Sequence, residues 1–183
     1  MKKGKFIVVS GPSGVGKGTI CNVLINELNA WYSVSKTTRE KREGEEEGKN
    51  YYFVTKEEFE KEIKENNFIE YNIYNNNYYG TPKDKILEKI DEGIDVFLEI
   101  DVNGARNIKK QFPNSLLIYI APPSLEELRR RLVNRGTETE EKIQNRLKIA
   151  EEELKQTDMY DYIVVNDDLD TAIDEVRQII KKG

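Results

Sequence analysis

The chain has 183 residues, of which 37% are hydrophobic and 34% are charged, and its formal net charge at pH 7 is −5. This length predicts one well-packed domain with small insertions, and the acidic balance argues against a nonspecific nucleic-acid binder. Because the chain contains no histidine and only one cysteine, Cys21, it cannot form an internal disulfide, a cysteine-cluster metal site or a catalytic Ser-His-Asp or Cys-His group.

The first predicted strand spans residues 6–9, a short apolar run that leads directly into a glycine-rich segment. The run is too short for a signal-peptide core or a membrane span, so we expect a cytoplasmic protein. After the glycines, Ile20, Val23, Leu24 and Leu28 recur at helical spacing. Strand, loop and helix are therefore predicted in that order.

Strands and helices alternate through much of the remaining chain. A helix is predicted over residues 85–92, where Gly93 ends it, and strands are predicted over residues 94–100, 116–120 and 162–165. This alternation predicts an α/β fold with a parallel sheet flanked by helices and joined by right-handed crossovers.

Three later helices are marked by capping residues at their starts. Ser124 is followed by Glu127 and Thr137 by Glu140, the spacing of a capping box, and Asp168 precedes the last apolar-periodic segment. We expect a helix to begin directly after each of these caps.

Two stretches interrupt the alternation. Residues 36–81 are rich in Tyr, Asn, Gly and charge, with short strand-like pieces around one helix that Thr55 and Glu58 would cap, which predicts a small β-rich insertion. Residues 125–150 are helical in pattern and rich in arginine. The second stretch is therefore a candidate for contact with anionic groups.

The strongest chemical signal is the segment Gly-Pro-Ser-Gly-Val-Gly-Lys-Gly-Thr at residues 11–19. Glycines let backbone amides turn inward around phosphate oxygens, the following helix adds its positive N-terminal end, and Lys17 supplies a charge to the terminal phosphates. A strand before and a helix after are the context that this P-loop motif requires. Gly18 stands where the commonest pattern has Ser or Thr. The segment predicts nucleotide binding by a P-loop NTPase-type fold.

Two other patterns are ambiguous by themselves. Arg39 and Arg42 lie three residues apart and can both bind one phosphate group, but a solvated charge run is the commoner explanation of such a pattern. Glu99 and Asp101 are predicted to project from the same side at the carboxyl end of one strand, facing the phosphate loop. There they can orient magnesium and its waters; the alternative is a solvent-exposed pair.

A series of short motifs follows the glycine-rich loop along the chain. In order, they are Ser-x-Thr-Thr-Arg-x-x-Arg-x-Gly-Glu from residue 35, Tyr-x-Phe from 51, Phe-Ile-Glu from 68, Asn-Tyr-Tyr-Gly-Thr from 77, Glu-Ile-Asp from 99, Arg-Gly-Thr-Glu from 135 and Val-Asn-Asp-Asp from 165. This series resembles the guanylate kinase family over nearly the whole chain. The resemblance implies ATP-dependent phosphorylation of GMP to GDP by direct in-line transfer, a step of purine nucleotide metabolism. It also implies Mg²⁺ as cofactor and dGMP as a further acceptor.

The resemblance assigns roles to individual residues. The ATP-binding residues would be Gly11, Pro12, Ser13, Gly14, Val15, Gly16, Lys17, Gly18, Thr19 and Asn166. The GMP phosphate would be held by Arg39, Arg42, Tyr51 and Tyr79. Guanine would be recognised by Ser35, Glu70 and Thr81, Glu45 would brace the site, and Glu99 and Asp101 would complete it.

Catalysis would rest on Lys17, Arg39 and the arginines of a lid that closes over ATP, Arg131, Arg135 and Arg146. Magnesium would be held through phosphates and water, with Thr19, Glu99 and Asp101 as candidate protein ligands. Asn166 and Asp167 would lie near adenine, and a helix cap is the alternative for this pair. Glu99 and Asn103 depart from the family, which usually has aspartate and glutamine at these positions.

The resemblance also implies an organisation and a set of partners. One guanylate-kinase-like domain would span residues 1–183, with a core of residues 1–35, 82–124 and 151–183, a GMP-binding lobe of residues 36–81 and a lid of residues 125–150. The expected partners are GMP and ATP, without nucleic acid or membrane. The protein is expected to act as a monomer or homodimer.

Two other functions compete with this interpretation. A non-catalytic guanylate-kinase-like module that binds proteins is disfavoured because Lys17, Arg39 and Arg42 are all present. A kinase for a different nucleoside monophosphate is disfavoured by Ser35 and Glu70, which match the hydrogen-bonding edge of guanine and leave polar groups unpaired against adenine.

Overall fold

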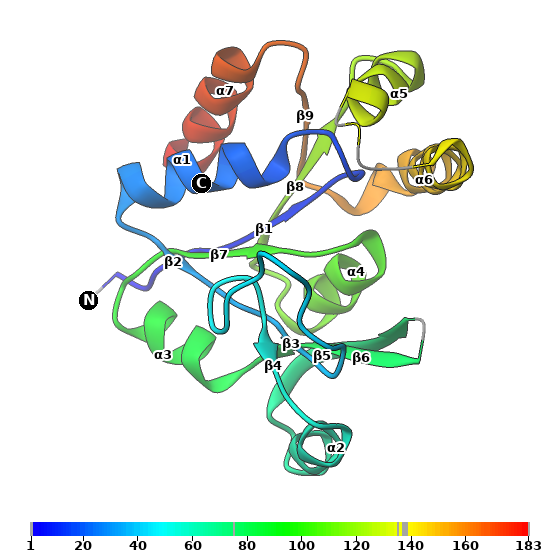
Figure 1. The fold of residues 1–183 in the computed structure, drawn as a ribbon. Coiled ribbons are helices and arrows are strands. Elements are labelled where there is room, and N and C mark those ends of the chain that lie inside the picture. The colour runs from blue at the N-terminus through cyan, green and yellow to red at the C-terminus, as the bar shows by residue number, and fades with distance from the viewer. Residues whose placement is uncertain (1, 75, 135, 137–138, 183) are drawn as a thin grey trace.

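A computed structural model describes residues 2–74, 76–134, 136 and 139–182 (Figure 1). Its centre is a five-stranded sheet with strand order β2-β7-β1-β8-β9. The strands are β1 (Phe6–Ser10), β2 (Trp31–Tyr32), β7 (Val96–Glu99), β8 (Leu116–Ala121) and β9 (Tyr162–Val165). Neighbouring strands in this sheet run parallel, so the predicted parallel α/β fold is confirmed.

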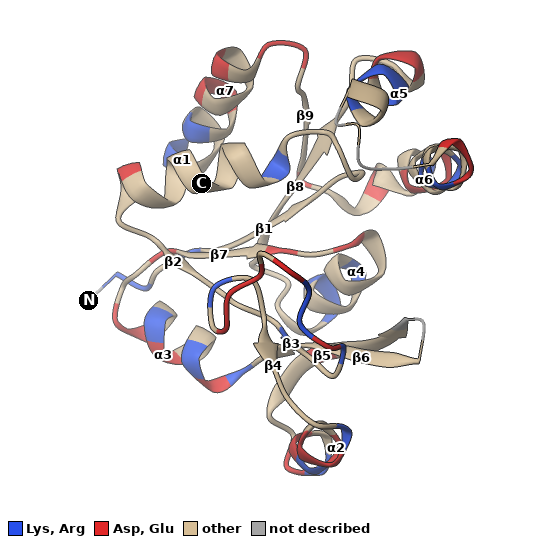
Figure 2. Cartoon of the chain, in the orientation of Figure 1, with Lys and Arg blue, Asp and Glu red and all other residues tan. Residues whose placement is uncertain are grey.

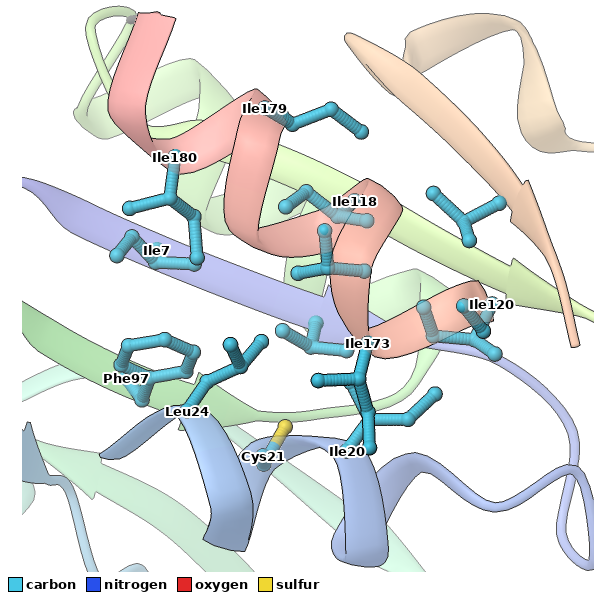
Figure 3. Packing of buried hydrophobic residues seen from close by; sticks show 14 of the residues in the cluster. Ile7, Ile20, Cys21, Leu24, Phe97, Ile118, Ile120, Ile173, Ile179 and Ile180 are labelled. Atoms are coloured by element: carbon cyan, nitrogen blue, oxygen red, sulfur yellow. The ribbon is translucent and has the colours of Figure 1, made fainter. Parts of the chain in front are cut away.

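Helices cover both faces of the main sheet (Figure 1). One face carries α1 (Lys17–Leu28) and α7 (Leu169–Lys182), and the other carries α3 (Asp84–Asp91) and α4 (Val102–Gln111). On the first face, isoleucines of α7 lie over β1 and β8, while Ile20, Cys21 and Leu24 of α1 approach from the side of Phe97 (Figure 3). Burial of this apolar surface is the main force that fixes the sheet, and with it the loop between β1 and α1.

A second sheet of four strands, with order β4-β3-β6-β5, lies apart from the first. Its strands are β3 (Lys36–Thr37), β4 (Tyr52–Phe53), β5 (Phe68–Tyr74) and β6 (Asn77–Pro82). Helix α2 (Lys56–Lys64) packs on it through the buried Phe59, which stacks on Phe68 with ring centroids 4.3 Å apart. Thr55 and Glu58 form the predicted capping box at the start of α2. The mixed sheet matches the predicted β-rich insertion.

Helices α5 (Leu125–Asn134) and α6 (Glu140–Leu154) pack against each other beside the carboxyl edge of the main sheet (Figure 1). Their shared core consists of Leu128, Leu132, Ile143 and Ala150. The Ser124 hydroxyl accepts a hydrogen bond from the Glu127 N–H, as predicted. A short 3₁₀ turn, η1 (Thr157–Met159), then leads towards β9.

Several observed elements differ from the predicted ones. The strand predicted over residues 94–100 is only Val96–Glu99, because Asp101 has already become the N-cap of α4 and accepts a hydrogen bond from Gly104 N–H at 2.7 Å. Helix α4 itself was not predicted. The cap of α6 is Thr139, whereas the predicted cap, Thr137, lies outside the described residues.

Charge is concentrated on the helices and loops, and the strands of the main sheet are mostly uncharged (Figure 2). The loop between β3 and β4 carries charges of both signs (Figure 2). No helix in the described part of the chain is long and apolar enough to cross a membrane.

Candidate active site

The glycine-rich loop joins the end of β1 to the start of α1, at the carboxyl edge of the main sheet. Gly11 and Gly16 have φ of 146° and 98°, and a side chain at Gly16 would lie 2.6 Å from the Asn166 amide nitrogen. Only glycine tolerates both the positive φ and this close approach. The Lys17 ammonium donates to the carbonyl oxygens of Gly11 at 2.6 Å and Pro12 at 3.3 Å. The loop thus curls around the lysine that would meet a phosphate chain.

A chain of hydrogen bonds ties this loop to α5. The buried Asn166 amide donates to the Val15 carbonyl at 2.7 Å. The backbone carbonyl of Asn166 in turn accepts from the Arg131 guanidinium at 2.9 Å, and Glu127 holds the same guanidinium at 2.8 Å. Asp168 is the residue that caps α7, through the Thr171 N–H. Asn166 is therefore an anchor of the phosphate loop and not a helix cap.

Helix α6 reaches the loop through a second arginine. The Arg146 guanidinium forms a hydrogen bond with the Ser13 hydroxyl. Two of the three arginines expected in the lid, Arg131 and Arg146, are thus connected to the phosphate loop. The third, Arg135, lies outside the described residues.

A cavity of about 310 Å³ lies between the small sheet and the end of β7. Six of the predicted GMP-binding residues line it: Ser35, Tyr51, Glu70, Tyr79, Glu99 and Asp101. The cross-strand register explains part of this arrangement, because Glu70 lies opposite Thr81 and Asn72 lies opposite Tyr79. Side chains two residues apart on a strand share a face, so these pairs present their polar groups on one side of the sheet.

Glu70 is the most buried carboxylate of the cavity, with 9% of its surface exposed. Thr81 is completely buried beside it and donates its hydroxyl to the carboxylate at 2.7 Å. Burial raises the pKa of Glu70 to about 7, with the Thr81 hydrogen bond opposing the shift and Asp101 adding to it. A buried carboxylate with free acceptor capacity is suited to a ligand that offers paired N–H donors.

Arg39 is fixed by a carboxylate outside the cavity wall. Glu45 binds its guanidinium at 2.7 Å, and the other carboxylate oxygen of Glu45 accepts from the Arg42 backbone N–H at 2.8 Å. The Arg39 guanidinium also lies 5.6 Å from the centre of the Tyr51 ring. Burial raises the pKa of Tyr51, and the charges of Arg39 and Arg42 oppose that shift. The two arginines and the cavity tyrosines therefore share one electrostatic environment, although the Arg42 side chain is exposed.

Glu99 borders both the cavity and the phosphate loop. It lines the cavity, and its carboxylate oxygens lie 4.0 Å from the position that a Cβ atom on Gly18 would take. Burial raises the pKa of Glu99, while the Lys17 charge and a hydrogen bond with Cys21 oppose the shift. Asp101 lines the same cavity but leaves the strand, so the expected pairing of the two carboxylates along one strand was wrong.

The residues described hold no group of three or more Cys, Asp or Glu side chains arranged to bind a metal ion. Glu99 and the exposed Thr19 do offer oxygen atoms of the kind that Mg²⁺ prefers. The chemistry of these oxygen donors fits a Mg²⁺ ion.

Sequence reasoning missed two residues that the structure connects to the site. Asn72 lines the cavity two residues after Glu70 on β5, a spacing that pointed to it. Glu127 holds Arg131 from one turn earlier in α5, and its i to i+4 spacing was the available signal.

Comparison with known proteins supplies the family. The sequence model of the guanylate kinase family matches residues 3–183. The guanylate kinase of Clostridium tetani (strain Massachusetts / E88) is 52% identical over 180 residues, which cover 98% of this chain and 86% of that protein. The guanylate kinase of Clostridium acetobutylicum is 50% identical over 179 residues, with the same coverage of both chains. The crystal structure of guanylate kinase from Anaplasma phagocytophilum superposes with a TM-score of 0.81 at 36% identity, covering 99% of this chain and 86% of that one. The chain belongs to the guanylate kinase family.

Proposed function

We propose that this chain transfers the terminal phosphoryl group of ATP to GMP in a single in-line step, and that dGMP serves as a further acceptor. The observation that carries the proposal is the position of Glu99, which borders both the cavity and the phosphate loop. Such a shared border would bring an acceptor phosphate in the cavity within reach of donor phosphates on the loop. Phosphoryl transfer needs mainly such positioning and charge stabilisation, which explains how a chain without histidine can catalyse it.

Guanine would be recognised at the buried end of the cavity. The Glu70 carboxylate can accept from both N1–H and the exocyclic amine of guanine, with Thr81 holding the carboxylate and Ser35 donating to O6. Adenine has an acceptor at N1 and a donor at position 6. It would leave Glu70 and Ser35 unpaired in a buried site and be rejected.

The GMP phosphate would be held at the other end by Arg39, Arg42, Tyr51 and Tyr79. The pairing of Arg39 with Glu45 orients its guanidinium before the ligand arrives. Guanidinium groups match phosphate oxygens as bidentate donors, and tyrosine hydroxyls add neutral donors. The site would thus bind the dianion without needing a basic protein overall.

ATP would occupy the loop of residues 11–19, whose conformation Asn166 fixes through Val15. Lys17 would move from the carbonyls of Gly11 and Pro12 to the terminal phosphates. Arg131, Arg135 and Arg146 would stabilise charge on the transferring group as residues 125–150 close as a lid. Residues 36–81 would close in the same way on GMP, with residues 1–35, 82–124 and 151–183 as the fixed core.

Mg²⁺ would be held through phosphate oxygens and water, with Thr19, Glu99 and Asp101 as the protein groups nearest to it. When bound, it would neutralise charge on the phosphates that leave with ADP. We also propose that the protein works in the cytoplasm, where ATP is available, as a monomer or homodimer. A buried, unpaired Cys21 is compatible with a reducing compartment.

A coupled ADP-release assay with GMP, dGMP, AMP, CMP and UMP as acceptors tests the proposal. We expect turnover with GMP and dGMP and little with the other three. Lys17→Ala should lose most of kcat while the variant stays folded, because the lysine charge would act on the terminal phosphates of ATP. A preference for AMP would refute guanine recognition. Absence of turnover with every acceptor would instead support a non-catalytic binding module.

A further inference from the structure

Four polar side chains gather in the interior behind the phosphate loop, and the proposed function uses none of them. They are Ser10 at the end of β1, Tyr119 on β8, Glu153 in the last turn of α6 and Tyr160 just before β9. In each, one oxygen is buried and has no hydrogen-bond partner among the described residues: Ser10 Oγ, Tyr119 Oη, Glu153 Oε2 and Tyr160 Oη. We call these four residues the interior polar cluster.

The members of the cluster lie close enough to influence one another. The rings of Tyr119 and Tyr160 are 5.1 Å apart between centroids. Burial raises the pKa of both tyrosines, and the Glu153 carboxylate adds to both shifts. Ser10 opposes the shift of Tyr160 and is completely buried, as is Tyr119. Burial also raises the pKa of Glu153, which the Lys17 charge opposes. The cluster therefore extends electrostatically to the phosphate-loop lysine.

Buried polar atoms in proteins are almost always hydrogen-bonded, to the protein or to ordered water. A carboxylate oxygen that can only accept, together with three hydroxyl groups that can donate and accept, is a complete set of partners for internal water. Ser10 lies near enough to Tyr160 to lower its pKa as a hydrogen-bonding neighbour, but the two hydroxyl groups do not reach full hydrogen-bond geometry. Water is the ligand whose chemistry matches this set.

Helix α6 meets the phosphate loop on the face that carries this cluster. Arg146 and Glu153 are seven residues apart on α6, so two helical turns place them on the same face. Arg146 contacts the loop directly at Ser13, whereas Glu153 faces the cluster that contains Ser10, the residue before Gly11. One helix face thus approaches the loop at Ser13, inside it, and at the cluster that contains Ser10, just before it.

We propose that the interior polar cluster holds buried water, and that Glu153 is a positioning residue that couples α6 to the start of the phosphate loop through this water. The inference rests on the proposed function, because it takes α6 as part of the lid over ATP. Glu153 does not touch substrate. It sets the angle at which α6 leaves the core, and so the place of Arg146 over the loop.

The test compares Glu153→Leu, Glu153→Gln and Tyr160→Phe, with Glu152→Leu as the matched control. Glu152 lies one residue earlier, is exposed and pairs with Lys155. We expect Glu153→Leu to raise the KM for ATP about tenfold and leave the KM for GMP within about twofold. Glu153→Gln keeps a hydrogen-bonding side chain, so its KM for ATP should stay within about threefold of the wild-type value. The KM for ATP of Tyr160→Phe should lie between those of the two Glu153 variants. The double variant Glu153→Leu/Tyr160→Phe should have no higher KM for ATP than Glu153→Leu alone, because both residues act through one network.

Unchanged ATP kinetics in Glu153→Leu, or an equal rise of both KM values accompanied by a lower Tm, would overturn the positioning role. Should Glu153→Leu fail to fold, Tyr160→Phe decides by the same criterion, since it removes one hydroxyl group only. A high-resolution crystal structure should contain water within hydrogen-bond distance of at least three of the four oxygens. A structure without such water would refute the proposal that the cluster is hydrated. Turnover of GMP by the wild type is measured in the same assay, so failure of the proposed function is recognised separately.

Discussion

Glu45 holds Arg39 with one carboxylate oxygen, at 2.7 Å, and the backbone N–H of Arg42 with the other, at 2.8 Å. One acidic side chain therefore fixes both the orientation of the Arg39 guanidinium and the backbone conformation at Arg42. The Arg39 hydrogen bond is the main reason why the pKa of Glu45 is lowered, followed by the Arg42 N–H. The brace is thus complete at neutral pH and is lost only as the pH falls through that lowered pKa.

The first prediction concerns this brace. Glu45→Gln should raise the KM for GMP about tenfold, because the neutral amide no longer orients the Arg39 guanidinium before the phosphate arrives. The Tm should change little, because a glutamine amide oxygen can still accept the hydrogen bond from the Arg42 backbone N–H. Steady-state kinetics with varied GMP measure the effect. Glu43→Gln, at an exposed glutamate in the same loop, is the control and should behave as wild type. Equal effects of the two substitutions would contradict the brace.

The second prediction concerns the protonation of Glu70, whose pKa is raised from 4.5 to about 7. A raised carboxylate pKa stabilises the unliganded fold at low pH, and this contribution is lost as pH rises through about 7. Guanine recognition requires the ionised form. We therefore expect GMP affinity to increase as pH rises from about 5.5 to about 7.5, by up to about tenfold per unit below pH 7.

Calorimetric titration with GMP over this pH range measures the effect. The GMP phosphate titrates in the same region, so Glu70→Gln, which retains that titration, is the necessary reference. The variant should bind more weakly at pH 7.5 and show a shallower pH dependence than wild type. Parallel pH profiles for the two proteins would show that Glu70 does not change protonation when GMP binds.

The phosphate loop and the sheet that supports it were predictable from sequence, because their signals are local. The β1 run, the loop glycines and Lys17 are contiguous, and the strand over residues 162–165 was placed correctly as β9. Helix α4 was missed because its helical pattern is short and weak: only Val102, Ala105 and Ile108 mark its apolar face, and the asparagines and Gly104 have low helix propensity. Strand β6, whose motif at residues 77–81 also suits a surface turn, owes its strand conformation to pairing with β5 and β3.

The acceptor site could not be derived from local patterns. Its lining comes from Ser35, Tyr51, Glu70, Tyr79 and Asp101, which are spread over several elements and meet only through tertiary structure. The resemblance to a family identified these residues, whereas spacing alone left Arg39 and Arg42 as an ambiguous charge run. Asn72 was missed although its spacing of two residues from Glu70 puts both side chains on one face of β5, and its position opposite Tyr79 follows only from strand pairing.

The third prediction concerns Cys21. Its thiol is completely buried, and burial, together with the nearby Glu99 charge, raises its pKa well above the ordinary value. Only the thiolate reacts with electrophiles and disulfide reagents. We expect no reaction with a colorimetric thiol reagent in the native protein, and one equivalent after unfolding in guanidinium chloride. Rapid native labelling that abolishes activity would mean that α1 opens far more readily than its packing implies.

The fourth prediction concerns Asn166, whose side chain and carbonyl connect Val15 of the phosphate loop to Arg131 of α5. Asn166→Ala leaves the Val15 carbonyl without its partner, and this should lower the free energy of unfolding by about 1–3 kcal/mol. The loop would lose its fixed shape, so the KM for ATP should rise more than the KM for GMP. Asn166→Asp should lower the free energy of unfolding and raise the KM for ATP more than Asn166→Ala does, because a carboxylate oxygen would then face a carbonyl oxygen at 2.7 Å. Denaturant unfolding and kinetics with each substrate varied in turn measure the two effects. An aspartate variant as stable as wild type would mean that the Val15 carbonyl does not depend on the Asn166 amide, and that the loop keeps its shape without this link to α5.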